Sequence, residues 1–317
     1  MRQRIVAEIL IPGRGEPVEN GTVVVAGGSI EYAGPTAGAP SSDPDEVVVE
    51  APVVMPGLWD CHAHFTGMLR PDLTNFVDNP IVNAARAVAD AAAMVDGGVT
   101  SVRDVGGLGL FLGRAFAEGR VKGPRVFAAG RILSTTGGHG DIHALPLDFV
   151  HSVCERHDFS ILCDGVPEVL KAVRTNLRAD AKVIKICASG GVMSEVDHPI
   201  HQQFSHEELV AIVEEAARAE RIVAAHCHGK PGIMAALAAG AKTIEHGSYL
   251  DEEAADAMIE ADAILVPTRF VVDQLLGQAD RLPRYAYEKG LMVAEAQANA
   301  MKLAIAKGVT IAMGTDI

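Results

Sequence analysis

The chain has 317 residues, 49% of them hydrophobic and 21% charged, which is ordinary for a folded protein and excludes a disordered chain. Its length allows one large domain, or a large domain with a small one. The net charge of −14 is not offset by a basic patch, which argues against a nucleic-acid or anionic-membrane partner.

The sequence also indicates a compartment. No apolar run approaches the roughly 18 residues that span a bilayer. The N-terminal stretch has neither the apolar core nor the cleavage site of a signal peptide. Five cysteines with no C-x-x-C motif are typical of a reducing environment. We therefore expect a cytoplasmic protein that does not bind membranes.

Residues 1–52 differ from the rest of the chain. Short β-branched runs at 22–34 and 46–54 are separated by Gly, Pro and Asp, and helical periodicity is absent. This pattern predicts small antiparallel strands. We expect residues 1–52 to form the N-terminal part of a small β-sandwich-type domain.

From Val53 onward, a unit recurs that consists of an alanine-rich amphipathic helix, a Gly stop and a short apolar strand. Gly97 and Gly98 end the first such helix. Ser205 and Glu208 form a capping-box pattern at the start of a later one. Eight apolar strands are recognisable, at 53–65, 99–107, 124–134, 182–191, 221–229, 241–248, 262–268 and 309–317.

Nearly continuous apolar strands that alternate with helices predict a parallel sheet covered by helices. Eight such units favour a closed, TIM-like (β/α)8 barrel over residues 53–317, with a doubly wound open sheet as the alternative. The stretch 135–165 is rich in Gly, His and Asp, so we expect it to form a long loop at the active face.

Polar and titratable side chains follow the strands, where such barrels place their chemistry. They are His62 and His64, Arg103 and Asp104, Arg131, Lys185, His226 and His228, Glu245 and His246, Thr268 and Arg269, and Asp316. Taken singly, each has a simpler explanation: a strand-end histidine is often merely hydrogen-bonded, and Asp316 can cap a helix. Together, histidines, a buried lysine and an aspartate at one end of a barrel indicate a site for Zn²⁺ or a related divalent ion.

Lys185 lies between two isoleucines and cannot ligate a metal as an ammonium, which has no lone pair. Burial lowers the pKa of a lysine, and a neutral amine can react with carbon dioxide to form a carbamate. The two oxygens of a carbamate can bridge two metals. The alternative is that Lys185 pairs with an acid such as Asp104.

Several motifs, in their order along essentially the whole chain, resemble the amidohydrolase superfamily. They are PGLWDCHAHF, KVIKICASGGV, AAHCHG, TIEHGS and MGTD. The resemblance is greatest to its bacterial imidazolonepropionase-like group of Xaa-Pro and Xaa-Arg dipeptidases and carboxypeptidases. It implies a binuclear zinc site with one metal on His62, His64 and Asp316, the other on His226 and His246, and carboxylated Lys185 as the bridge. Imidazolonepropionase itself lacks the bridging lysine as a rule, so Lys185 points away from that activity.

The resemblance also implies hydrolysis of an amide bond in a small molecule, such as a dipeptide or an N-acyl amino acid, by a metal-bridging hydroxide. Asp316 would accept the proton of the water and deliver it to the leaving amine. His139 and His228 match family positions that contact substrate, although His139 has the alternative of only stiffening its loop.

Other functions remain open at this point. The same metal site suits carbamate, urea or ester cleavage, and a barrel can also serve as a non-catalytic scaffold, although scaffolds typically lose ligands. The resemblance to the family also suggests that the protein forms a homo-oligomer. Superfamily members continue well past the motif that contains Asp316. We therefore expect the sequence to be truncated after strand eight. Of the proposed ligands, Asp316 is the one whose position this truncation would affect most.

Overall fold

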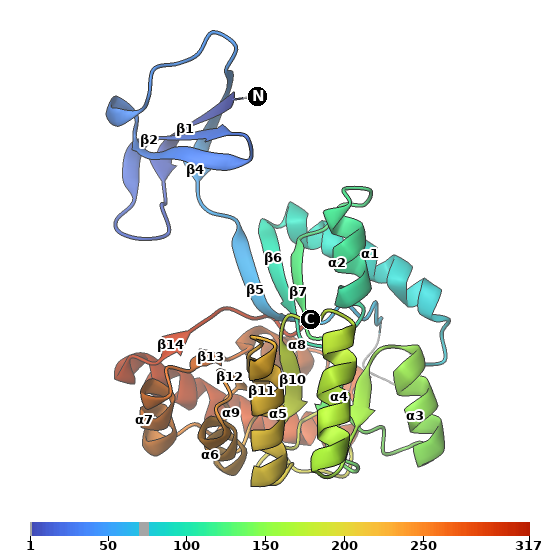
Figure 1. Cartoon of the computed structure of the whole chain (residues 1–317). Helices are drawn as coiled ribbons and strands as arrows, with labels where there is room; N and C mark the ends of the chain where they lie inside the picture. The colour runs from blue at the N-terminus through green and yellow to red at the C-terminus, as the bar shows by residue number, and fades with distance from the viewer. Residues whose placement is uncertain (1, 70–75) are drawn as a thin grey trace. The chain divides into compact units, whose positions relative to one another are not determined.

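The computed structural model describes residues 2–69 and 76–317, and the chain divides into two compact units, Met1–Leu58 and Trp59–Ile317 (Figure 1). The first unit contains a four-stranded sheet in the order β3-β2-β1-β4. Its strands are β1 (Arg2–Leu10), β2 (Val18–Ala26), β3 (Ser29–Pro35) and β4 (Val47–Val54), with the 3₁₀ turn η1 (Thr36–Gly38) after β3. The expected antiparallel pairing holds for β1–β2 and β2–β3, whereas β4 lies parallel to β1. The connection 36–46 is long enough to return the chain for this parallel pairing.

The run that we expected to begin the first barrel strand instead completes β4, whose Val54 pairs with Leu10. Pro56 and Gly57 then interrupt the extended chain, since proline has no N–H for a strand ladder. The first barrel strand, β5, therefore begins at Leu58. The division into residues 1–52 and 53–317 remains a prediction.

The second unit confirms the α/β class and the TIM-like (β/α)8 barrel. Its strands are β5 (Leu58–Ala63), β6 (Val99–Asp104), β7 (Arg125–Ala128), β8 (Ile132–Ser134), β9 (Ser160–Leu162), β10 (Ile184–Cys187), β11 (Val223–Cys227), β12 (Thr243–His246), β13 (Ile264–Val266) and β14 (Thr310–Ile311). They form a three-stranded sheet, β5-β6-β7, and a seven-stranded sheet, β14-β13-β12-β11-β10-β8-β9. Backbone hydrogen bonds join the two sheets into a ring: Lys182 N–H to Ala128 O and Cys61 N–H to Met313 O, each 2.8 Å long.

The stretch 135–165 is not all loop, contrary to our expectation. It contains α3 (Leu147–Arg156) and β9. Val150, Val153 and Cys154 form one apolar face of α3, and this face packs with Leu162 and Ile142 in a separate hydrophobic cluster. The apolar spacing at three and four residues favours a helix there, although the surrounding Gly, His and Asp residues suggest a loop.

The other helices of the second unit are α1 (Pro80–Asp96), α2 (Gly109–Ala117), α4 (Val166–Arg178), α5 (His206–Arg218), α6 (Lys230–Ala239), α7 (Glu252–Glu260), α8 (Arg269–Leu276) and α9 (Arg284–Lys307), with the 3₁₀ turn η3 (Ala279–Arg281) before α9. The predicted capping box is confirmed, since the Ser205 side chain accepts the Glu208 N–H and the Glu208 side chain accepts the Ser205 N–H. Gly97 ends α1 as predicted.

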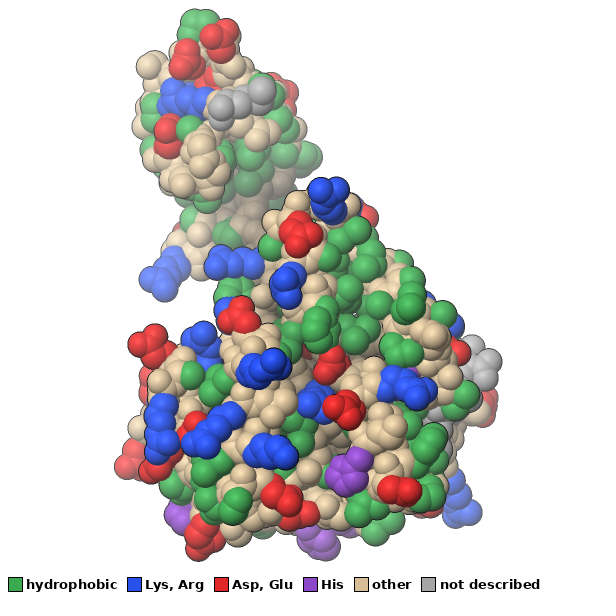
Figure 2. Space-filling view, turned by 45° about the vertical axis from the view of Figure 1, so that its right-hand side comes forward, with side chains coloured by type: hydrophobic (Ala, Val, Ile, Leu, Met, Phe, Trp, Pro, Cys, Tyr) green, Lys and Arg blue, Asp and Glu red, His purple; other side chains and the backbone are tan. Residues whose placement is uncertain are grey.

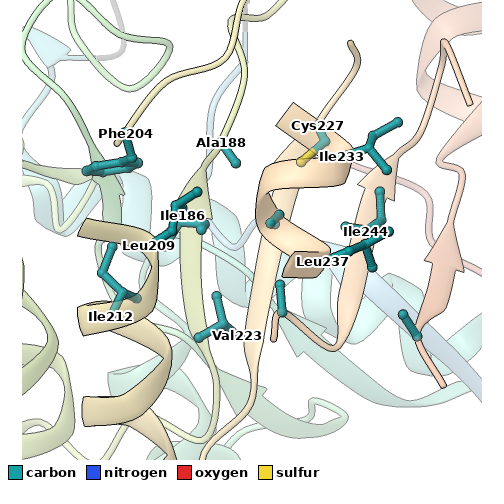
Figure 3. Close-up of a cluster of buried hydrophobic side chains, with 14 of the residues drawn as sticks. Ile186, Ala188, Phe204, Leu209, Ile212, Val223, Cys227, Ile233, Leu237 and Ile244 are labelled. Atoms are coloured by element: carbon teal, nitrogen blue, oxygen red, sulfur yellow. The ribbon is translucent and has the colours of Figure 1, made fainter. Parts of the chain in front are cut away.

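Buried aliphatic side chains hold the helices against the strands (Figure 3). Leu209 and Ile212 of α5 lie beside Ile186 of β10, and Ile233 of α6 lies near Ile244 of β12. All five are fully buried. At about 1.5–3 kcal/mol for each buried side chain of this size, this packing holds the strands that carry the polar side chains firmly in place.

Two features of the structure concern the partners expected from the sequence: the distribution of charge on the surface and the apolar character of the helices. Figure 2 shows acidic, basic and apolar side chains interspersed over one face of the molecule. Among residues 2–69 and 76–317, no helix combines the length and the apolar character needed to cross a membrane.

Candidate functional site

The two histidines of β5 meet Asp316 at the end of the barrel. Asp316 Oδ1 lies 3.3 Å from His62 Nε2 and 3.2 Å from His64 Nε2. The Asp316 N–H donates to His62 O at 2.7 Å, so the backbone itself sets this approach. The three side chains offer donor atoms that lie within 4.8 Å of one another, which is a suitable set for a divalent ion.

A second group of donors follows β11 and β12. Donor atoms of His226, His228 and His246 also lie within 4.8 Å of one another, and all three side chains are buried. The structure therefore places His228, which we expected to contact substrate, as close to His226 and His246 as a third ligand would be. The two groups adjoin, because His246 Nδ1 lies 3.7 Å from Asp316 Oδ2.

Lys185 of β10 lies beside the first group. Its Nζ is 3.3 Å from His62 Nε2, and the residue is 2% exposed. Burial lowers the pKa of Lys185, against the opposing charges of Glu245 and Asp316. The alternative pairing with Asp104 is absent from the salt bridges of the described residues, and Asp104 Oδ1 instead accepts the Gly106 N–H at 2.9 Å.

The hydrogen bonds of the histidines leave the opposite ring nitrogens free for a metal. His64 Nδ1 donates to Gly106 O at 2.8 Å, and His226 Nε2 donates to Gly190 O at 3.2 Å. A carbonyl oxygen can only accept, so the lone pairs of these two rings are on His64 Nε2 and His226 Nδ1. Such bonds to the non-ligating nitrogen are the usual companion of metal-binding histidines, and the residues therefore fit a pair of divalent ions.

A buried ion pair between Arg103 and Glu245 orients the ring of His62. Glu245 Oε2 accepts a 2.7 Å hydrogen bond from His62 Nδ1, and Arg103 Nη2 contacts both Glu245 oxygens at 2.7 and 2.8 Å. Burial raises the pKa of Glu245, but Arg103 and His62 outweigh it and bring the pKa to about 2. Glu245 thus remains ionised and keeps the Nε2 lone pair of His62 directed toward Asp316 and Lys185.

Arg103 and Glu245 stood among the strand-end residues, but the sequence showed no role for them. Glu245 and His246 are consecutive, and ordinary strand alternation would point them to opposite faces. His246 has a φ of 70°, however, which breaks the alternation and lets both side chains reach the site. Thr268 (φ 50°) and Asp316 (φ 64°) also adopt left-handed conformations, and Thr268 Oγ1 lies 2.7 Å from His246 Nδ1. Such backbone strain concentrates at functional sites.

We expect the Arg103→Met variant to lose stability, because it leaves the fully buried carboxylate of Glu245 without its cation. Breaking a buried pair in this way costs about 3–5 kcal/mol of unfolding free energy, which urea denaturation would measure. Arg178→Met, at the exposed end of α4, is the matched control and should change the unfolding free energy by less than about 0.5 kcal/mol. Equal unfolding midpoints for the two variants would contradict the assigned role of the ion pair.

The two residues expected to contact substrate also reach this end of the barrel. The rings of His139 and His226 are stacked with centroids 4.3 Å apart. His228 Nδ1 lies 2.8 Å from Ser248 Oγ. Burial lowers the pKa of His139 to about 4 and that of His228 to about 3, so both imidazoles are neutral near pH 7. The sequence did not single out Ser194 and Asp197, which lie beside His139, or Lys289, which binds their loop. These residues lie in a loop and a helix without a recognisable motif.

Known proteins resemble this chain over most of its length. A model of the Amidohydrolase family matches residues 53–317. Ochratoxinase of Aspergillus niger is 42% identical over 327 aligned residues, which cover 98% of this chain and 68% of that protein. A crystal structure of a prolidase complexed with N-methylphosphonate-L-proline is 33% identical, with a TM-score of 0.93 over 100% of this chain and 79% of that one. A crystal structure of a Xaa-Pro dipeptidase is 31% identical, with a TM-score of 0.87 over 100% and 80% of the two chains.

Proposed function

The chain belongs to the amidohydrolase family, and from this membership we propose that it hydrolyses an amide bond in a dipeptide, an N-acyl amino acid or a similar small molecule. The observation that carries the proposal is the convergence, at one end of the barrel, of two adjoining groups of metal-type donors with a buried lysine beside them. The likeness to an ochratoxinase and to prolidases supports amide hydrolysis in particular.

The proposed metal site uses the side chains that meet there. His62, His64 and Asp316 would hold one ion, and His226 and His246 the other, with Lys185 carboxylated as the bridge. Two divalent ions, which we expect to be zinc, would supply Lewis acidity for the scissile carbonyl and a lowered pKa for a bound water. His228 would either complete the second group or contact the substrate.

Asp316 is the proposed proton carrier. Burial raises its pKa, but the electrostatic effect of the neighbouring His62 and His64 rings outweighs it and holds the pKa well below its usual range. The carboxylate is therefore ionised and can accept the proton of the attacking water at one oxygen. It would then return the proton to the leaving amine nitrogen as the amide C–N bond breaks.

His139 and His228 are the proposed substrate contacts. In each ring Nδ1 contacts a serine hydroxyl, Ser194 and Ser248 respectively, so Nε2 is the nitrogen that would face the substrate. Two imidazoles held in this way beside His226 would orient the substrate, which is how such contacts lower an activation barrier.

Two other functions use the same observations. Carbamate, urea or ester hydrolysis would employ the same donors. A non-catalytic scaffold would not need two adjoining groups of donors, and their presence weighs against that function.

Metal analysis separates enzyme from scaffold. We expect about two divalent ions per purified chain, since a site of this class holds a pair of ions. Treatment with a strong chelator should abolish hydrolysis, and added Zn²⁺ should restore it. Elemental analysis by mass spectrometry, together with the activity of the treated protein, provides the measurement. Full activity in metal-free protein would contradict the proposed metal site.

A substrate library tests the reaction. It would contain dipeptides with C-terminal proline or arginine, N-acyl amino acids, and matched carbamates and esters. Release of free amino acid from the amides, followed by chromatography, supports the proposal. If the carbamates or esters are cleaved and no amide is, the alternative hydrolase function replaces it.

A further inference from the structure

Asp197 is a buried carboxylate outside the metal donors, and it organises the loop that follows β10. Its side chain is 6% exposed. Its oxygens accept the Gly191 N–H at 3.1 Å, the Gln203 Nε2–H at 3.2 Å and the Ser194 hydroxyl. The proposed mechanism uses none of these contacts.

Three of the groups bound to Asp197 touch His139. Ser194 Oγ lies 2.9 Å from His139 Nδ1, and Gln203 Oε1 accepts the His139 backbone N–H at 3.1 Å. Gly191 lies directly against the ring, because a Cβ added there would be 2.1 Å from His139 Cε1. Asp197 therefore reaches the side chain, the backbone and the packing surface of a histidine that lies 58 residues before it.

Lys289 of α9 binds the same loop. Its ammonium, on a side chain 13% exposed, donates to Ser194 O at 2.7 Å, to Gly191 O at 3.3 Å and to the backbone oxygen of Asp197. It also lies 3.3 Å from Asp197 Oδ1, so it compensates the buried charge. One turn earlier on α9, the Tyr285 hydroxyl donates to Met193 O at 3.3 Å.

We propose that Asp197 and Lys289 are positioning residues for His139. They fix the loop 191–197, which holds the His139 ring against His226 with Nδ1 bound to Ser194 and leaves Nε2 for the substrate. The inference rests on the proposed function, in which His139 contacts substrate. To the proposed function it adds the residues that determine the position of the His139 ring. Small displacements of a substrate-orienting group lower the reaction rate strongly.

A double-mutant cycle tests the inference with N-benzoylglycine and glycyl-L-proline as probe substrates. We expect Asp197→Asn and Lys289→Met each to lower kcat/KM by about 10–100-fold, chiefly through KM, with the metal content unchanged. In a His139→Ala background they should cause no further loss, because residues that act through one side chain are not additive. Lys302→Met, at an exposed position of the same helix, is the control and should leave the kinetics unchanged. If Asp197→Asn or Lys289→Met instead lowers kcat/KM by the same factor in the His139→Ala background as in the wild type, the inference is overturned.

Hydrogen exchange followed by mass spectrometry provides a readout that needs no turnover. The His139 amide, bound to Gln203 Oε1, should exchange about 10-fold faster in Asp197→Asn and Lys289→Met, and at the original rate in Lys302→Met. If the wild-type protein cleaves no member of the substrate library, the proposed function fails, and exchange at residues 137–141 alone decides the inference. Unchanged exchange there in both variants would overturn it.

Discussion

Protein carrying Lys185→Ala should retain fewer than about two divalent ions per chain and lose at least about 10²-fold in kcat/KM. Residues that merely orient metal ligands cost 10–100-fold when they are mutated, and a bridging ligand should cost no less. The geometry behind this expectation is the position of Lys185 Nζ, 3.3 Å from His62 Nε2 in a buried setting that lowers the pKa of the amine. Elemental analysis and steady-state kinetics measure the two effects.

The control for Lys185 is Lys182→Ala, at an exposed position two residues before β10 begins. Among residues 2–69 and 76–317, the Lys182 side chain pairs with Asp180 and with no residue of the site, so metal content and kinetics should not change. A carbamate on Lys185 should also give a ¹³C resonance in wild-type protein prepared with labelled bicarbonate, and Lys185→Ala should lack it. Wild-type metal content and activity in Lys185→Ala would contradict the bridging role.

The Asp316→Asn variant should retain its fold and lose about 10²–10⁴-fold in kcat, which is the range for removal of a general acid–base group. The amide has the shape of the carboxylate but cannot take a proton from water and pass it on. Asparagine also tolerates the left-handed backbone at this position, where φ is 64°, so the substitution introduces no new backbone strain. Single-turnover kinetics at saturating substrate provides the measurement.

Asp262→Asn is the matched control, because Asp262 is exposed and also has a positive φ, of 48°. Its kcat should equal that of the wild type. Metal content must be measured for Asp316→Asn as well, since Asp316 is also a proposed ligand: loss of one ion alone would assign the defect to binding. A kcat within about threefold of wild type, with both ions present, would rule out Asp316 as the proton carrier.

Much of the barrel could be predicted from local patterns. Apolar strands, alanine-rich helices and Gly stops recur from β5 to β14, and each pattern depends on neighbours a few residues away. The errors occurred where the local signal was weak. At residue 53, an apolar run continues the preceding sheet, and in 135–165, the apolar face of α3 is hidden among residues that favour loops.

Sequence alone determined the order of the chemistry-bearing residues and the end of the barrel where they lie. Periodicity assigns His62, His64, Lys185, His226, His246 and Asp316 to strand ends, and parallel strands end on one side.

Only the tertiary structure decided which atoms face one another. The bond of His62 to Glu245 spans 183 residues and that of Lys289 to Ser194 spans 95, so neither leaves a local pattern in the sequence. The positive φ of His246 adds a further departure from strand alternation. Hydrophobic periodicity fixes the direction of a side chain relative to its own element, whereas hydrogen bonds between distant elements depend on how the ring closes and the loops pack.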